Sequence, residues 1–163
     1  MIFYGNHEQQ LDAKRRLPVT AALRDFIKPD RDGSNYTALV WPDGHLRLYS
    51  QAYYVDLVRE SLVKCASSAE QQEVLRVFQD AYTLKPDTQG RVVLPEKLIA
   101  KAKLPTEVVL RGMTDHIEVW SLAEWKAAEE PVDLASVNEI TFRAAQKLAK
   151  KGRRANAKRQ EQL

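Results

Sequence analysis

The feature that most constrains the fold is an internal duplication. Moving the chain by 75 positions places Asp12 on Asp87 and Arg16 on Arg91, and apolar positions after each arginine also coincide. A second alignment, at 71 positions, places "TALVWPDGHLRLYS" on "VVLRGMTDHIEVWS". The offsets differ because the first copy carries four extra residues, most simply in the loop "KPDRDGSN". Two copies of one supersecondary unit therefore make up most of the chain.

Each copy has the pattern of a strand, a short helix and a β-hairpin. In the second copy, "RVVL" is a β-rich run after a polar turn, and Pro95 suits the first position of a helix through "EKLIAKAKL". "EVVLRG" and "HIEVW" flank "MTD" as the strands of a hairpin. Ser121 followed by Glu124 is typical of a capping box that opens another helix. The first copy repeats the strand, helix and hairpin, with "WPDG" as its turn.

The remaining segments are predicted to be helical. Apolar residues recur at helical spacing within 53–82, and Ser68 with Gln71 is the cap expected for that segment. Pro131 marks the end of the second copy, and Ser136 is expected to cap a last helix. The expected organisation is a first unit at 3–54, a helical connector at 55–81, a second unit at 82–128, and a C-terminal helix with a basic tail at 129–163.

The size of each copy bears on the fold class. One copy alone is too small to bury the apolar face of its strands. Two interleaved copies can close a small β-barrel that leaves few strand edges exposed. We therefore expect an α+β protein in which two tandem units form a small double-hairpin β-barrel with flanking helices.

The charge is distributed unevenly along the chain. Residues 141–163 contain eight Lys or Arg and one acid, whereas the preceding 140 residues contain 17 basic and 21 acidic groups. Overall basicity therefore does not make the body a polyanion binder. The tail suits either a nonspecific electrostatic arm on DNA or a solvated helix, and its basic residues on one helical face are Lys147, Lys150, Lys151, Arg154 and Lys158.

Several functional classes find no support in the sequence. No apolar run reaches 18 residues, and the N-terminus lacks the regions of a secretory signal, so we expect no membrane partner. The single cysteine, Cys65, excludes an internal disulfide framework and favours the reducing cytoplasm. The three histidines have no metal-ligand spacing, and no nucleophile–base pair or phosphate-binding loop is present. We expect no enzyme activity, no cofactor and no small-molecule substrate.

The duplicated Asp–Arg turns are the candidate site. An Asp at the start of a tight turn can accept hydrogen bonds from the N–H groups that follow it, and a glycine there can take positive φ. The next arginine then offers its donors to a phosphate or to guanine. For one copy alone, the Asp–Arg pair more simply closes the turn. Its duplication, together with the motif resemblance that follows, favours contact with double-stranded DNA. The predicted DNA-binding residues are Lys14, Arg15, Arg16, Gln89 and Arg91, supported by Asp12, Asp87 and Gly90.

The motif D-x-x-G-R-V-x-L-P-x-x-L, present from Asp87 to Leu98, resembles the signature of AbrB-type swapped-hairpin DNA-binding domains. Two such units in one chain, with F-x-G at Phe3 and Gly5 before "LDAKRR", resemble the MraZ family. The resemblance implies a bacterial transcriptional regulator that assembles into a ring-shaped homo-oligomer. It also implies binding to short repeated DNA elements upstream of the division and cell-wall gene cluster, including the protein's own promoter. Such a regulator is cytoplasmic and nucleoid-associated, and its motif arginines contact DNA.

The two copies depart from the motif in different places. In the first copy, Arg15 replaces the glycine before the arginine, and Pro18 lies inside the expected strand. In the second copy, Ile99 follows the leucine where an arginine is usual, whereas the first copy keeps Arg24 there. DNA contact can therefore differ between the copies. A second class of function is an antitoxin-like module that binds another protein, but an acidic or apolar tail would support that class, and this tail is basic.

Overall fold

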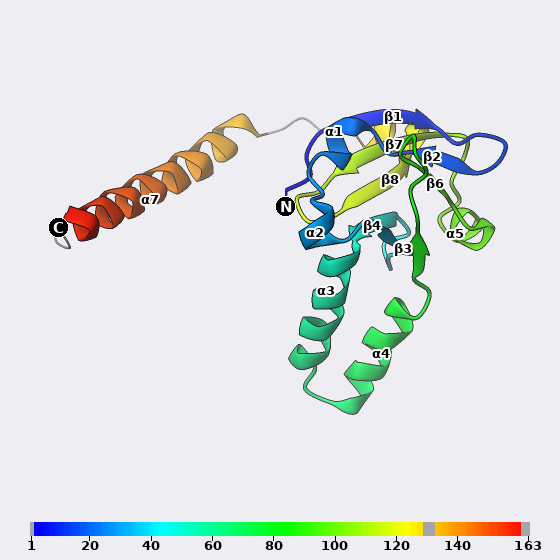
Figure 1. Ribbon diagram of the computed structural model, residues 1–163, viewed down its shortest axis with the longest axis horizontal. Coiled ribbons are helices and arrows are strands. Elements are labelled where there is room, and N and C mark those ends of the chain that lie inside the picture. The colour runs from blue at the N-terminus through cyan, green and yellow to red at the C-terminus, as the bar shows by residue number, and fades with distance from the viewer. Residues whose placement is uncertain (1, 129–132, 161–163) are drawn as a thin grey trace. The chain divides into compact units, whose positions relative to one another are not determined.

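The computed structural model describes residues 2–128 and 133–160, with side chains described as far as residue 149. The chain divides into two compact units, Met1–Ala128 and Glu129–Leu163. The first unit contains the strands and six short helices, and the second contains the helix α7 (Leu134–Gln160). These elements can be followed in Figure 1. The protein is mixed α+β, as the sequence predicts.

The strands form one large sheet and one small ribbon, and every pair is antiparallel. The order in the six-stranded sheet is β1 (Asn6–Gln10), β7 (Glu107–Gly112), β8 (Ile117–Ser121), β4 (Leu46–Ser50), β3 (Tyr36–Val40) and β5 (Tyr82–Leu84). The ribbon pairs β2 (Arg16–Pro18) with β6 (Arg91–Val93).

The prediction of a closed β-barrel is wrong for the described residues. The large sheet is open, because β1 and β5 are its two end strands and each pairs along only one side. β2 and β6, which would have to join the sheet to close it, pair with each other instead. The hydrophobic core then lies between the sheet and the ribbon, so burial of the apolar side chains does not require closure.

The order of elements repeats, and the repeats are interlocked. The first strand of each copy pairs with the hairpin of the other copy, since β1 pairs with β7 and β5 pairs with β3. At two places a residue faces its own equivalent in the other copy. Leu17 lies opposite Val92 in the ribbon, and Arg47 lies opposite Glu118 in the sheet. The two copies are therefore related by an approximate two-fold axis through these pairs.

The core is built from equivalent apolar positions of both copies. Leu17 and Val92 of the ribbon are fully buried, as are Leu23 and Leu98, which follow their strands in the same way in each copy. A smaller cluster lies on the opposite face of the sheet and includes Phe78. The strands β3, β4, β7 and β8 therefore have buried residues on both faces of the sheet.

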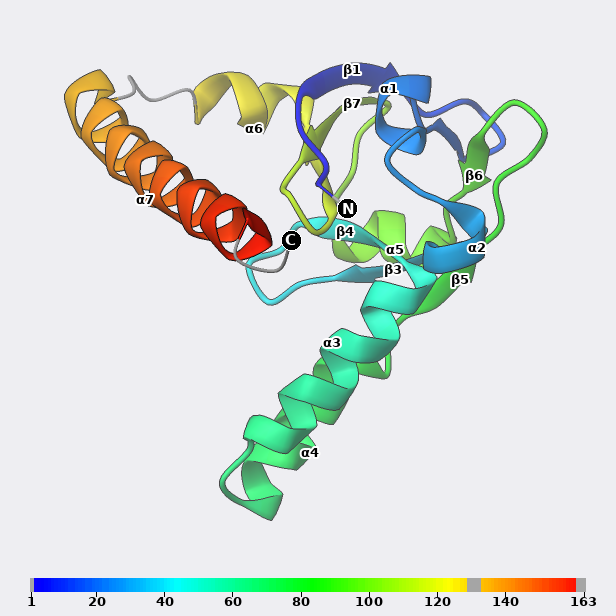
Figure 2. The same cartoon turned by 60° about the vertical axis from the view of Figure 1, so that its left-hand side comes forward.

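Five helices connect strands, and a sixth follows the last strand, β8. They are α1 (Ala21–Arg24), α2 (Pro29–Asp32), α3 (Gln51–Lys64), α4 (Ser68–Phe78), α5 (Glu96–Lys101) and α6 (Leu122–Ala127). Helices α3 and α4 form a hairpin that projects from the sheet in both ribbon views (Figures 1 and 2). The turns before β2 and β6 lie next to each other, away from the tip of this helical hairpin (Figure 2).

Some helix boundaries differ from the sequence prediction. The segment predicted as one helix is interrupted at 65–67, because the Ser67 hydroxyl accepts a hydrogen bond from the Glu70 N–H and starts a new helix there. Pro95 precedes α5 as its cap residue and is not the first helical residue. At α7, Asp133 accepts hydrogen bonds from the first free N–H groups in place of the predicted Ser136.

One predicted cap is confirmed. The Ser121 hydroxyl accepts a hydrogen bond from the Glu124 N–H at 3.1 Å and donates one to the Glu124 carboxylate at 2.9 Å, so α6 begins where the sequence indicates. The predicted end of the second copy at Pro131 lies outside the described residues.

Candidate nucleic-acid interface

The first Asp–Arg turn is held by a single carboxylate. Asp12 Oδ1 accepts hydrogen bonds from the N–H groups of Lys14 at 2.8 Å and Arg16 at 2.9 Å. The other oxygen, Oδ2, accepts one from Arg16 Nε at 2.5 Å. The carboxylate thus binds both the backbone of the turn and the arginine side chain. These contacts, led by the Arg16 N–H, lower the pKa of Asp12.

The second turn repeats the same contacts. Asp87 Oδ1 accepts from the N–H groups of Gln89 and Arg91, both at 2.9 Å. Asp87 Oδ2 lies 2.8 Å from Arg91 Nε and 2.7 Å from Arg91 Nη2. The Arg91 N–H is the main cause of the lowered pKa of Asp87. Because both turns are built alike, the sequence duplication extends to the hydrogen bonds of the site.

The residue before each arginine has a left-handed backbone. Gly90 has φ of 77°, and Arg15 has φ of 60° at the equivalent position. A side chain in this region costs roughly 1–2 kcal/mol, whereas glycine takes it freely. The replacement of the motif glycine by Arg15 therefore leaves the turn geometry unchanged and introduces backbone strain.

The two arginines lie on one face of the ribbon. Leu17 and Val92 point into the core, so the alternating residues Arg16 and Arg91 point to the opposite side. The side chains of both arginines keep about 30% exposure, at 31% and 28%, and the neighbouring Val93 is 53% exposed. The ion pair that closes each turn therefore forms while the arginine side chain stays partly exposed, and contact with DNA stays a prediction.

The other predicted residues surround this face. Lys14 and Gln89 are exposed in the two turns. Arg15 is also exposed, but its Nη1 lies 3.1 Å from the carboxylate of Glu96. Glu96 belongs to the second copy, and its spacing in the sequence gives no sign of this contact. The structure thus brings the five predicted residues to one ribbon and adds an acidic neighbour to one of them.

The two turns are also joined to each other. The Val19 N–H donates a hydrogen bond to the Gly90 carbonyl at 3.1 Å, and the Leu94 N–H donates one to the Arg15 carbonyl at 2.9 Å. The strand end of each copy therefore holds the turn of the other. Sequence reasoning did not find these contacts, because they depend on the pairing of β2 with β6.

The basic tail, predicted to be a DNA arm, belongs to the second unit. Lys147 is exposed on α7, and Leu134, Phe142 and Leu148 are exposed apolar residues of the same helix. The backbone of α7 is helical as far as Gln160, but the side chains of the other predicted arm residues, Lys150, Lys151, Arg154 and Lys158, lie outside the described residues.

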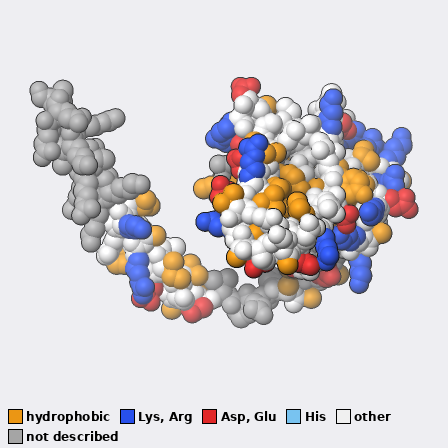
Figure 3. Space-filling model, turned by 90° about the horizontal axis from the view of Figure 1, so that it is seen from below, with side chains coloured by type: hydrophobic (Ala, Val, Ile, Leu, Met, Phe, Trp, Pro, Cys, Tyr) orange, Lys and Arg blue, Asp and Glu red, His pale blue; other side chains and the backbone are white. Residues whose placement is uncertain are grey.

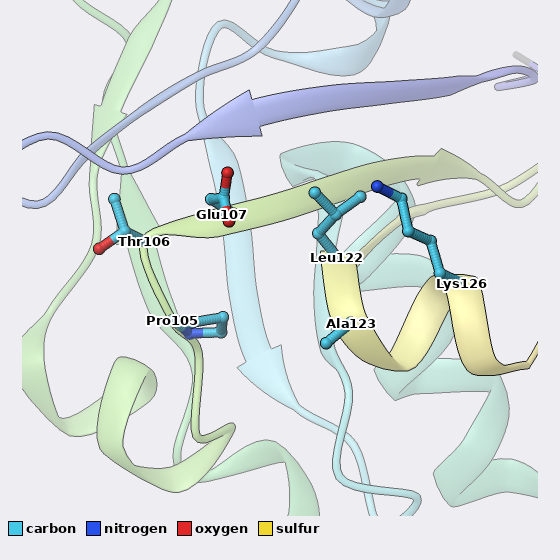
Figure 4. Close-up of a pocket in the computed structure, with 6 residues that line it drawn as sticks. All are labelled: Pro105, Thr106, Glu107, Leu122, Ala123 and Lys126. Atoms are coloured by element: carbon cyan, nitrogen blue, oxygen red, sulfur yellow. The ribbon is translucent and has the colours of Figure 1, made fainter.

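Other surfaces of the described residues have different character. On the face seen in Figure 3, apolar side chains gather near the centre of the first unit and Lys or Arg side chains lie around the rim. A hollow of about 490 Å³ lies between α6 and the start of β7, and Figure 4 shows its lining. Among the residues that the structure describes, its ionisable lining side chains are Glu107 and Lys126, which do not form a nucleophile–base pair.

No helix among the described residues is both long and apolar enough to cross a membrane. No group of three or more His, Cys, Asp or Glu side chains in the described part of the chain is arranged to hold a metal ion.

The fold and the site define a class: a tandem-repeat α+β protein that exposes two similar Asp–Arg turns on a β-ribbon. Comparison with known proteins identifies the family. A family model described as "MraZ protein, putative antitoxin-like" matches residues 77–148. The Transcriptional regulator MraZ of Pediococcus pentosaceus is 33% identical over 147 residues, which cover 86% of this chain and 99% of that protein.

Two further relatives have the same name. The Transcriptional regulator MraZ of Mycoplasmopsis pulmonis is 29% identical, covering 88% of this chain and 95% of that protein. That of Roseiflexus castenholzii is 30% identical, covering 91% and 97% respectively. The chain belongs to the MraZ family of transcriptional regulators, and the resemblance found in the sequence is confirmed. These relatives are named as regulators and not as enzymes.

Proposed function

We propose that this protein is a sequence-specific DNA-binding regulator that reads DNA with the β2–β6 ribbon and its two turns. The observation that carries the proposal is the pair of similar turns, each presenting an arginine held by its own aspartate on the exposed face of one ribbon. A two-stranded ribbon fits the major groove of B-DNA, where arginine binds guanine through two hydrogen bonds.

The aspartate clasp prepares the arginine for this role. Each guanidinium has five N–H donors, and the aspartate engages those of Arg16 Nε and, in the second turn, Arg91 Nε and Nη2. Arg16 therefore keeps both terminal nitrogens for a base or phosphate, and Arg91 keeps Nη1 and the second N–H of Nη2. Because the clasp already fixes the side-chain rotamer, less conformational entropy is lost when DNA binds.

The family relationship supports a more specific role. We propose that the protein assembles into a homo-oligomeric ring in the cytoplasm and nucleoid, and binds repeated elements upstream of the division and cell-wall gene cluster, including its own promoter. A single protomer offers two small turns, so useful affinity for repeated elements requires several protomers acting together. Light scattering tests the assembly, and a particle of only 18.6 kDa at micromolar concentration contradicts it.

Footprinting on the DNA upstream of the protein's own gene tests the function. Protection of short repeated elements by the wild type, and its loss in Arg16→Ala or Arg91→Ala, is the expected result. The control is Arg59→Ala, which removes one positive charge from an exposed site on α3, where the Arg59 side chain is 74% exposed. If both turn variants protect the same elements as the wild type while remaining folded, the ribbon is not the reading surface.

The tail provides a second comparison. Deletion of residues 141–163 removes eight basic groups and is expected to weaken binding to operator and random DNA by similar factors. The slope of affinity against salt is also expected to flatten, because fewer phosphates are contacted. Selective loss of operator binding would instead make the tail part of the specific contact.

A further inference from the structure

The side chain of Arg24 lies on the turn of the other copy. A Cβ built on Gly90 would lie 2.5 Å from Arg24 Cζ and 2.6 Å from both Arg24 Nε and Nη1. The guanidinium of Arg24, at the end of α1 in the first copy, therefore packs against the backbone of the second Asp–Arg turn. Gly90 is needed here for two reasons: its positive φ, and the absence of a side chain where the guanidinium packs.

The surroundings of Arg24 are unusual for a charged side chain. Its Nε is buried and has no hydrogen-bond partner among the residues that the structure describes. The guanidinium is also close enough to the buried Tyr36 for its charge to oppose the rise in the pKa of Tyr36 that burial causes. Burying part of a charged group without a partner costs stability, so simple packing does not account for an arginine at this position.

The equivalent position in the second copy shows the alternative. Ile99 follows Leu98 as Arg24 follows Leu23, and Ile99 is partly buried against the hydrophobic core. An aliphatic side chain therefore serves for packing at this place in the fold. Arg24 lies beside the turn that contains the glycine. In the other turn, the side chain of Arg15 pairs with Glu96.

We propose that Arg24 is a positioning residue: from the first copy it holds Gly90, and through Gly90 it fixes the Asp87–Arg91 turn in the orientation that presents Arg91. The planar guanidinium covers the glycine, which has no side chain of its own to restrict the turn. The Val19 N–H, which also belongs to the first copy, donates a hydrogen bond to the Gly90 carbonyl. Two contacts from the first copy therefore hold the second turn. The consequence for DNA rests on the proposed function of Arg91.

Amide hydrogen exchange measured on the full chain tests the positioning directly. The Gly90 N–H donates to the Asp87 carbonyl at 2.9 Å, and the Arg15 N–H donates to the Asp12 carbonyl at 2.8 Å. In Arg24→Ile, which copies the side chain of Ile99, exchange at Gly90 is expected to rise about tenfold, while exchange at Arg15 stays the same. The unchanged first turn shows within the same molecule that the variant is folded.

A conservative variant and a charge control complete the experiment. Arg24→Lys keeps the charge but not the planar group, so it is expected to restore only part of the protection at Gly90. Arg59→Ile removes a charge elsewhere and is expected to leave both turns unchanged. If Arg24→Ile leaves exchange at Gly90 unchanged and instead lowers the salt slope of DNA binding by about one phosphate, Arg24 contacts DNA directly and the positioning role is wrong.

Operator binding separates this inference from the function on which it rests. If Arg24→Ile loosens the second turn and weakens operator binding, both proposals are supported. If it loosens the turn but Arg91→Ala binds the operator like the wild type, the positioning role stands and the proposed reading function of Arg91 fails. A turn that is equally protected in Arg24→Ile and the wild type overturns the positioning role whatever the DNA result.

Discussion

The two Asp–Arg turns share one hydrogen-bond pattern but are held in place by different means. The first turn has a strained Arg15 whose side chain pairs with Glu96 of the other copy. The second has a relaxed Gly90 covered by Arg24 of the other copy. The aspartate therefore sets the hydrogen bonds of the turn, whereas the left-handed residue can be stabilised by more than one kind of neighbour.

The largest effect is expected from removing the arginines that the two turns have in common. Arg16→Ala and Arg91→Ala are expected to leave the fold intact, since each side chain is partly exposed and lies on the face away from the core. Operator affinity is expected to fall by about 1–3 kcal/mol for each contact with a base, and a ring multiplies the loss. Titration of operator DNA with each variant measures whether the two turns contribute equally. If both variants bind operator DNA with wild-type affinity, the Asp–Arg pair serves only to close the turn.

Exchanging the left-handed residues is expected to give effects of opposite sign. Arg15→Gly removes strain and raises the free energy of unfolding by about 1–2 kcal/mol, while affinity for random DNA falls because one charge is lost. Gly90→Ala introduces similar strain and also places a Cβ 2.5 Å from Arg24 Cζ, so it destabilises by about 1–2 kcal/mol or more. Thermal or urea unfolding measures both.

The contact with Arg24 can be isolated from the backbone strain. Gly90→Ala is expected to cost less in an Arg24→Ala background, because the added methyl group then meets no guanidinium. Equal costs in the two backgrounds would show that only the backbone conformation matters at this position.

A smaller effect is expected at the ion pair of the first turn. The Arg15 and Glu96 side chains are 48% and 85% exposed, so their pairing contributes at most about 1 kcal/mol to stability. Glu96→Gln is expected to leave unfolding nearly unchanged and to strengthen binding to random DNA slightly, because a negative charge near the phosphates is removed. Lys97→Gln on the same helix is the opposite-charge control. Weaker binding of the Glu96 variant would contradict this account of Arg15.

The smallest difference between the two turns is expected in their stability at low pH. The pKa of Asp12 and that of Asp87 are both lowered, chiefly by the N–H of the following arginine. A carboxyl with a lowered folded-state pKa stabilises the fold above its ordinary pKa of 3.8, and this contribution is lost as pH falls through the lowered value. Both turns are therefore expected to persist from neutral pH to about pH 4. Carbon-detected NMR titration measures each carboxyl, and a pKa above 3.8 in either would show that its clasp does not form in solution.

Local patterns predicted the repeated elements well. The Asp–Arg turns, the β7–β8 hairpin and the Ser121 cap depend on residues close in sequence, and the structure has each where the pattern indicates. The duplication added information that neither copy provides alone, because it showed which positions of the two turns are equivalent.

Contacts between the copies could not be predicted in the same way. Neither β1, whose sequence NHEQQ has no apolar residue, nor the three-residue β5 was predicted as a strand. The strands that pair with the two hairpins were therefore unknown, and a closed barrel was predicted where the sheet is open. The packing of Arg24 on Gly90 and the pairing of Arg15 with Glu96 depend on the crossing of the two copies. The available signs were the departures from the motif at Arg15 and Ile99, which marked the two copies as unequal.

The charges at the two-fold axis have a consequence for how the copies recognise each other. Arg47 faces Glu118, its own equivalent, and their side chains approach to 3.4 Å. As separate identical chains, two first copies would place Arg47 against Arg47, and two second copies would place Glu118 against Glu118. Like charges directly opposite in a sheet are unfavourable, so the mixed pair is favoured over either like pair. Cutting the chain at 65–67 is therefore expected to yield two fragments that form a heterodimer in preference to either homodimer.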